Sequence, residues 1–514
     1  PAGSIALPTT GAIVTATSSV VANATGTIGP YCLVSGNILP VDPTAPNIMF
    51  QLALPTTWNK KLMMFGGGGF DGSIPAVTGN TPQGTTTGLV PLGRGYAVFA
   101  SDSGHQDTSD GGGKFSTNQE AYLNFMGDAL KKTRDASYYL VQAFYLTNPV
   151  KSYFAGGSTG GRESLTVIQR WPADWDGAIA HYPAYDFSAL TLGQLSYAQD
   201  FAAPGAWLDT PKRTLLYNAA LSACDALDGA VDGVISNVQG CLSVFNPATA
   251  TLSGTALRCP GGVDTGDTCL SDAQITALNT ANSPVPFNFP LGSGETNYPG
   301  YNVTIADLGV PNSSPYAAYV SLLALGSIAP ASPVTSSMMF DLQISDSWTR
   351  YTVANNQIYN SLTLNITNPG AFASRLDYLS SLDATNANLT PFMLKGGKLL
   401  MMHGTTDQTV SPRATEAYLA RMQAIMGVNA VNSFARYYEV PGFQHAFSDV
   451  FMPSWDNLTE LENWVESAIV PPAQVITDSA GVPGRTRPLC TYPTYAKYSG
   501  TGSINLASSF TCSR

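Results

Sequence analysis

Short apolar segments that alternate with helical patterns constrain the fold of this chain most. Residues 47–54 alternate loosely, as an outer strand would, and residues 121–146 have the periodicity of one helix. Further apolar runs of strand length lie at 61–65, 96–100, 152–155, 178–180, 398–402 and 435–440. Strands that alternate with helices predict an α/β fold with a mostly parallel sheet covered on both faces.

This alternation stops after about residue 190 and returns near residue 395. The segment between holds four of the cysteines, much proline and glycine, and few clear strand–helix units. A chain of 514 residues is too long for one ordinary core. We therefore expect one α/β catalytic domain built from residues 1–190 and 395–514, with a lid domain, residues 190–395, inserted between its halves.

The composition excludes some partners and favours an extracellular location. The net charge is −11 and there is no basic run, so we expect no nucleic-acid partner. No stretch of 18 apolar residues occurs, so we expect no membrane span. Only 11% of residues are charged, and residues 1–4 lack the basic and apolar parts of a signal peptide. We expect a secreted or periplasmic chain whose signal peptide has been removed.

Six of the seven cysteines fall in close pairs along the sequence. Nearest-neighbour pairing predicts three disulfides, Cys224–Cys241, Cys259–Cys269 and Cys490–Cys512. Six cysteines allow 15 connectivities, so spacing alone leaves the others open. Cys32 is left over. No CxxC motif occurs, which argues against a zinc site.

A G-x-S-x-G motif places a candidate nucleophile between a strand and a helix. It reads Gly156-Gly157-Ser158-Thr159-Gly160 and follows the run at 152–155. The glycines permit a sharp turn that exposes the hydroxyl of Ser158, and the helix beyond offers backbone N–H groups to an oxyanion. An ordinary glycine-rich turn is the alternative in a chain with 49 glycines.

The order of residues in this type of fold then selects a base and an acid. In α/β-hydrolases the chain order is Ser, acid, His. Of the four histidines, His445 alone leaves room for an acid on a returning core strand after Ser158. Asp407 follows the strand at 398–402 and is the predicted acid. Asp449 is a rival by proximity, but it follows His445 in sequence.

Two other segments suggest supporting sites. Gly66 to Gly69 follow the run at 61–65, where a second oxyanion donor should arise, so we expect Gly68, Gly69 and Thr159 to form the oxyanion hole. Residues 224–234 carry three carboxylates at spacings of three and four, separated by turn glycines. They could wrap one hard cation, although the spacing fits a solvated acidic turn equally well. The ligands would be the side chains of Asp225, Asp228 and Asp232 and the carbonyls of Ala230 and Val234.

Taken together, these segments resemble the tannase and feruloyl esterase family over most of the chain. The resemblance is carried by residues 65–70 (Phe-Gly-Gly-Gly-Gly-Phe), 101–105 (Ser-Asp-Ser-Gly-His), 157–162 (Gly-Ser-Thr-Gly-Gly-Arg), 175–177 (Trp-Asp-Gly), 224–234 and 441–445 (Pro-Gly-Phe-Gln-His). It implies an α/β-hydrolase core, a lid over the triad, and a structural calcium ion at the five residues just named.

The resemblance also implies a serine carboxylic ester hydrolase acting on small aromatic or phenolic esters through an acyl-enzyme. Gallate esters and terephthalate-type polyester fragments are alternatives. The lid segment after Trp348 is mostly neutral, which favours a neutral phenolic ester. A more distant alternative is a non-catalytic extracellular binding protein on a hydrolase scaffold. The family usually joins a cysteine before the nucleophile to one after the histidine, whereas this chain has Gly157 and Ala446 there.

Overall fold

The core of the protein is a nine-stranded sheet. The structure is a computed structural model that describes residues 4–514; residues 1–3, on which part of the signal-peptide expectation rests, lie outside the described residues. The strands lie in the order β1-β2-β3-β5-β4-β6-β7-β12-β13, antiparallel from β1 to β5 and parallel from β5 onward. Their bounds are β1 Gly11–Val20, β2 Tyr31–Leu39, β3 Ile48–Pro55, β4 Lys61–Phe65, β5 Ala97–Ser101, β6 Lys151–Gly157, β7 Gly177–His181, β12 Lys398–Gly404 and β13 Ala435–Val440.

Both faces of the parallel part are buried, which is why its strands read as continuous apolar runs. Leu62 and Met64 of β4 pack into one core cluster, and Met63 and Phe65 pack into another. Helices α2 (Ala129–Tyr145), α3 (Thr159–Arg170) and α12 (Pro412–Met426) contribute to the first cluster, and α14 (Asn457–Ser467) contributes to the second. The sheet is therefore a middle layer with helices on either side.

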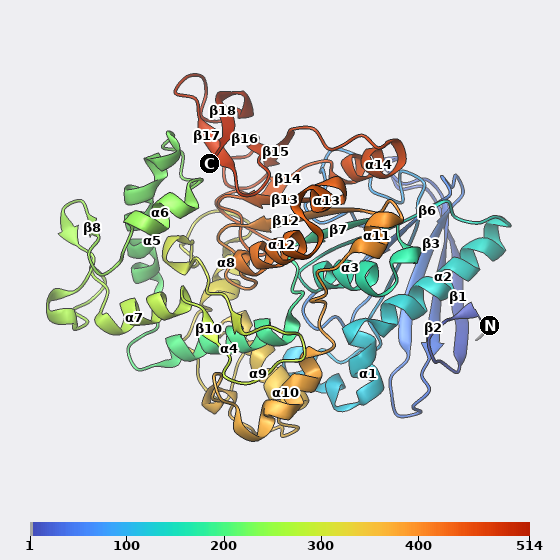
Figure 1. Ribbon diagram of the computed structural model, residues 1–514, viewed down its shortest axis with the longest axis horizontal. Coiled ribbons are helices and arrows are strands. Elements are labelled where there is room, and N and C mark those ends of the chain that lie inside the picture. The colour runs from blue at the N-terminus through green and yellow to red at the C-terminus, as the bar shows by residue number, and fades with distance from the viewer. Residues whose placement is uncertain (1–3) are drawn as a thin grey trace.

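Most of the segment between β7 and β12 lies beside this core, and its regular secondary structure is mainly helical (Figure 1). Its strands are two-residue pairs, β8 to β11, outside the large sheet. Its helices are α4 Phe187–Ala202, α5 Thr210–Cys224, α6 Val238–Val244, α7 Asp272–Ala281, α8 Ala317–Ala324, α9 Phe340–Trp348, α10 Ala373–Ser380 and α11 Thr390–Leu394. Whether it acts as a lid stays a prediction.

The remaining helices and strands are short. They are α1 Gln119–Leu123, α13 Val428–Phe434, β14 Pro453–Ser454, β15 Gln474–Asp478, β16 Thr486–Leu489, β17 Tyr495–Tyr498 and β18 Phe510–Ser513. No helix among residues 4–514 is both long enough and apolar enough to cross a membrane.

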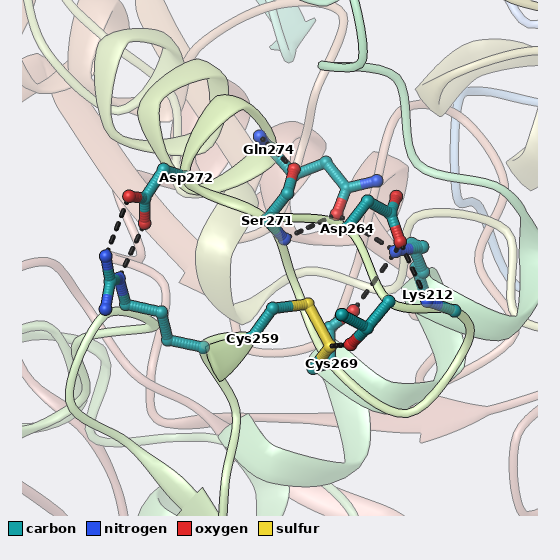
Figure 2. The surroundings of a disulfide bond; sticks show 10 residues. Lys212, Cys259, Asp264, Cys269, Ser271, Asp272 and Gln274 are labelled. Atoms are coloured by element: carbon teal, nitrogen blue, oxygen red, sulfur yellow. Dashed lines mark hydrogen bonds and ion pairs between the residues drawn. A yellow bond between two sulfur atoms is a disulfide. The ribbon is translucent and has the colours of Figure 1, made fainter. Parts of the chain in front are cut away.

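The three predicted disulfides are confirmed, and Cys32 is the free cysteine among the described residues. The bonds are Cys224–Cys241, Cys259–Cys269 and Cys490–Cys512. Figure 2 shows the surroundings of the second bond, where Lys212 Nζ donates to Asp264 and to the carbonyl of Cys269, at 2.8 and 3.1 Å. The disulfide and this buried ammonium together fix a loop that has little regular structure.

Two expectations about elements were wrong. Residues 48–55 form an inner strand, because β1 and β2 extend the sheet beyond them. β1 is mostly exposed, and its apolar residues do not alternate with polar ones as in a half-buried strand. Residues 121–146 are not one helix. Gly127 interrupts them with a φ of 137°, and a Cβ there would lie 2.8 Å from Thr166 Cγ2 on α3. The break lets the chain pass close to α3 before α2 begins.

Candidate active site

Ser158 sits on a strained turn between β6 and α3. Its φ and ψ are 60° and −122°, a conformation that a non-glycine residue rarely adopts. A Cβ on Gly156 would lie 2.3 Å from the carbonyl oxygen of Gly160, so the end of β6 can approach the start of α3 only because position 156 is glycine. This is the local geometry that the G-x-S-x-G motif predicts.

A chain of hydrogen bonds joins Ser158 to His445 and Asp407. His445 Nε2 lies 2.9 Å from Ser158 Oγ, and His445 Nδ1 lies 2.8 Å from Asp407 Oδ2. Because a carboxylate only accepts, the Nδ1–H donates to Asp407 and Nε2 is left to accept the serine hydroxyl. The structure thus brings together three residues that are up to 287 positions apart in sequence.

Asp407 is buried, and its surroundings keep it ionised. Burial would raise its pKa, but the charge of His445 and the hydrogen bonds from His403 and His445 hold the pKa well below its usual value. The other carboxylate oxygen accepts the N–H groups of Thr409 and Val410 at 2.9 and 2.8 Å. Asp407 therefore presents a fixed negative charge to His445. The rival acid, Asp449, instead accepts a hydrogen bond from Asn312.

The other three histidines make structural contacts. His105 Nε2 lies 2.5 Å from the Phe70 carbonyl, and its ring stacks on Phe115. His403 Nε2 lies between Asp407 Oδ2 and the Val410 carbonyl, at 3.2 and 2.9 Å. Burial and the nearby His403 lower the pKa of His181 to about 3. Among these histidines, the side chain of His403 alone contacts a member of the chain of hydrogen bonds, as a second donor to Asp407.

The predicted oxyanion donors lie on two loops that meet beside Ser158. Gly160 N donates to the Gly67 carbonyl at 3.1 Å, and Thr159 Oγ1 donates to the Gly69 carbonyl at 2.6 Å. Within residues 4–514, the N–H groups of Gly68, Gly69 and Thr159 make no hydrogen bond to the protein. They are therefore free to bind a ligand.

A buried pair of carboxyl groups anchors the glycine loop and was not foreseen from the sequence. Glu163 on α3 accepts the N–H of Gly67 at 2.9 Å and the hydroxyl of Ser103 at 3.2 Å. Burial, together with the charge of Glu163, raises the pKa of Asp71 well above its ordinary value. Both carboxyl oxygens of Asp71 are buried without a hydrogen-bond partner. The one hint in the sequence is the presence of a glutamate in the helix that follows the nucleophile, a helix that is largely buried.

Comparison with known proteins agrees with this geometry. The family model for tannase and feruloyl esterase matches residues 32–513. The chain belongs to the tannase and feruloyl esterase family. An uncharacterized esterase of Agrobacterium fabrum is 36% identical, covering 100% of this chain and 91% of that protein. Mono(2-hydroxyethyl) terephthalate hydrolase of Piscinibacter sakaiensis is 32% identical, covering 94% and 84%.

The fold of this family member also matches a solved structure. The crystal structure of feruloyl esterase B from Aspergillus oryzae superposes with a TM-score of 0.78 at 22% identity, covering 99% of this chain and 98% of that one. The family and the fold together establish that this chain is an esterase with an α/β-hydrolase fold.

Aromatic side chains from the inserted segment lie near the histidine loop of this esterase. Phe447, two residues after His445, stacks against Tyr316 and Tyr319, with ring centroids 5.2 and 4.9 Å away. Tyr319 is 54% exposed. Phe340 of α9 would lie 4.0 Å from a Cβ on Gly69. Aromatic surface therefore lies beside both the histidine loop and the glycine loop.

The segment after Trp348 contains one arginine, which the sequence analysis passed over. The guanidinium of Arg350 donates to both carboxylate oxygens of Asp110 at 2.8 Å, and its Nε donates to Asp346 at 2.7 Å. The pairing with Arg350 lowers the pKa of Asp110 to about 2. Arg350 is thus already neutralised by two carboxylates and is not free to bind a substrate carboxylate.

The residues of the expected calcium loop match the ion's chemistry in part. Asp228 Oδ2 is buried without a hydrogen-bond partner, and burial raises the pKa of Asp228 to about 6. The Asp225 carboxylate accepts the N–H groups of Asp232 and Gly233. Asp232 pairs with Arg487, and no cluster of three acidic, histidine or cysteine side chains suited to a metal occurs in residues 4–514. The oxygen donors fit calcium, but Asp232 would have to exchange its arginine for the ion.

Proposed function

We propose that this esterase is a serine carboxylic ester hydrolase that acts on small aromatic or phenolic esters through an acyl-enzyme. The observation that carries the proposal is the 2.9 Å contact between His445 Nε2 and Ser158 Oγ, with Asp407 behind the histidine. That distance is within the reach a general base needs. A non-catalytic binding protein would have no need for a strained serine aligned with a histidine and a buried carboxylate.

The proposed reaction follows from these contacts. His445 removes the proton of Ser158 Oγ as the oxygen attacks the ester carbonyl. The N–H groups of Thr159 and of Gly68 or Gly69 bind the oxyanion of the tetrahedral intermediate. When that intermediate collapses, His445 protonates the departing alcohol, and the acyl group stays on Ser158. Water, activated by the same histidine, then releases the acid.

The substrate preference is inferred from the aromatic and charged groups near the site. Phe447, Tyr316, Tyr319 and Phe340 offer flat apolar surfaces that suit an aromatic ring. Arg350 is occupied by Asp110 and Asp346, so a free carboxylate on the substrate would lack this partner. A neutral feruloyl-type ester is therefore favoured over a terephthalate monoester, and gallate esters are the second candidate.

The test is a substrate panel with one probe of the nucleophile. Esters of p-nitrophenol and of ferulic, gallic and terephthalic acids are compared by kcat/KM, and a fluorophosphonate is used to label the serine. The proposal expects labelling at Ser158 and the highest kcat/KM for feruloyl-type esters. An unlabelled, inactive protein would favour the binding-protein alternative, and preference for a terephthalate monoester would overturn the substrate class.

We also propose that a structural calcium ion is held by Asp225, Asp228, Ala230, Asp232 and Val234, and that the chain is secreted or periplasmic. The unpartnered oxygen of Asp228 supports the first proposal. The three disulfides support the second, because such bonds persist in oxidising compartments. Calcium there would have no part in the chemistry; it would stabilise the loop that Cys224–Cys241 also fixes.

Removal of calcium is expected to lower the melting temperature. An ion that binds only the folded state, and whose free concentration is 100 times its Kd, stabilises the folded state by about 2.7 kcal/mol. A chelator should therefore lower the Tm, added calcium should restore it, and Asp228→Ala should abolish both responses. Asp272→Ala, which removes an exposed carboxylate paired with Arg258, is the matched control and should keep them. A melting curve indifferent to chelator and calcium would contradict the site.

A further inference from the structure

Tyr182 lies between the nucleophile turn and the histidine loop. It directly follows β7, is 4% exposed, and has a φ of 33°, outside the usual range for a tyrosine. Its ring meets the ring of His445 edge-on, with centroids 5.0 Å apart and planes at 65°. Its N–H donates to the Met402 carbonyl at 2.6 Å. Tyr182 is thus held from the sheet side and contacts the proposed base through its ring.

The phenol of Tyr182 occupies the space beside Gly157. A Cβ on Gly157 would lie 2.5 Å from Tyr182 Oη and 2.6 Å from Cζ. Gly157 does not have a positive φ, so its backbone conformation alone does not require glycine. The side chain of Tyr182 is therefore what excludes a larger residue immediately before the nucleophile.

The side chain of Gln83 bridges Tyr182 and the loop that carries His445. Its Nε2 donates to Tyr182 Oη at 3.2 Å and lies 3.4 Å from the carbonyl of Ala446, the residue after His445. Its Oε1 lies 2.8 Å from His181 Nδ1. The lowered pKa of His181 keeps the ring uncharged, and the acceptor Oε1 selects the Nδ1–H form. That bond fixes the amide so that its NH₂ faces Tyr182 and Ala446.

Ala446 is a position that benefits from such a tether. Its φ is 60°, a left-handed conformation that is unfavourable for an alanine. The residue also sits immediately beside His445, so any relaxation of Ala446 would move the imidazole relative to Ser158. A displacement of about 1 Å at a reacting group can cost about 100-fold in rate.

We propose that Tyr182 and Gln83 are positioning residues that hold the His445 loop against the Ser158 turn. The connection runs from Gly157 through the phenol of Tyr182 and the amide of Gln83 to the Ala446 carbonyl. It joins the two loops without a covalent bond, at the positions where the resemblance implies a disulfide in relatives. The inference rests on the proposed roles of Ser158 and His445.

The first test removes each link and separates kcat from KM. Tyr182→Ala is expected to lower kcat about 100-fold, and Gln83→Ala and Tyr182→Phe about 10-fold, with KM unchanged because neither side chain is placed against the substrate. The rate of fluorophosphonate labelling should fall by the same factors. Tyr182→Phe and Gln83→Ala keep the test usable if Tyr182→Ala does not fold.

The chain contains a matched control for these variants. Gln169 Nε2 donates to Tyr418 Oη at 3.0 Å and to the Ala384 carbonyl at 2.7 Å, the same kind of bridge away from Ser158. Gln169→Ala should lower the Tm and leave kcat within about 2-fold. If Gln83→Ala and Tyr182→Phe behaved like Gln169→Ala, the two residues would be structural and the inference would be wrong.

The second test replaces the noncovalent link by a covalent one. In the parent chain, Gly157→Cys with Ala446→Cys should retain two extra free thiols after oxidation, because Tyr182 blocks the space. With Tyr182→Ala added, the disulfide should form and restore kcat at least 10-fold, and a reductant should reverse the gain. Free thiols persisting in this triple variant, or a disulfide without recovery of kcat, would overturn the inference. A parent enzyme that no fluorophosphonate labels would instead remove the proposed function itself.

Discussion

Ser158→Ala and His445→Ala are each expected to lower kcat/KM by about 10³-fold or more while the fold is retained. Ser158 supplies the atom that would carry the acyl group, and His445 Nε2, 2.9 Å away, is the group placed to take its proton. Neither side chain holds the core together; the turn at Ser158 is fixed by its backbone, whose N–H donates to the His181 carbonyl at 3.1 Å. The variants should therefore melt close to the parent.

The two losses should not add. Without His445 the serine hydroxyl has no base, and without Ser158 the histidine has no proton to accept, so the double variant should be about as inactive as either single one. The measurement is kcat/KM on a p-nitrophenyl ester for both single variants and the double. Ser164→Ala is the control, because Ser164 lies on the same helix and its hydroxyl only donates to the Gly160 and Ile179 carbonyls. Near-parental activity of His445→Ala would refute the assignment of the base.

Local sequence signals were sufficient to predict that Ser158, His445 and Asp407 lie together. The glycines around Ser158 indicate a sharp turn, because the backbone segments there lie too close together for a Cβ. The apolar runs before Asp407 and before the His445 loop indicate buried strands. In a parallel sheet, strand ends that are adjacent in space present their loops at the same edge. The order of motifs along the chain was therefore enough to bring the three side chains together.

The residues that support this site could not be inferred in the same way. Gln83, Tyr182 and Asp71 all have a positive φ without being glycine, and nothing in their sequence surroundings marks that conformation. Their partners are distant in sequence: Gln83 bonds to Tyr182 and contacts Ala446, 99 and 363 residues away. Such contacts depend on how the sheet is assembled. Similarly, β1 was missed because it is an exposed edge strand, held by backbone pairing with β2 rather than by burial of an apolar face.

Asp407→Asn is expected to lower kcat by about 10⁴-fold, more than its distance from the substrate would suggest. Asp407 Oδ1 accepts two backbone N–H groups, from Thr409 and Val410, so an asparagine would keep its oxygen there. Its NH₂ would then take the place of Oδ2, which faces His445 Nδ1 at 2.8 Å. Two donors would meet, and His445 could relieve this only by moving its hydrogen to Nε2.

An imidazole with its hydrogen on Nε2 cannot accept the proton of Ser158, so the base would be lost although every residue of the loop stayed in place. The fold should survive, because His403 Nε2 can still donate to the Val410 carbonyl at 2.9 Å. The measurement is kcat with the Tm as a check on folding. Asp449→Asn is the matched control, since Asp449 is the rival acid and bonds to Asn312 instead. If Asp407→Asn kept more than a tenth of kcat while Asp449→Asn lost it, the acid would have to be reassigned to Asp449.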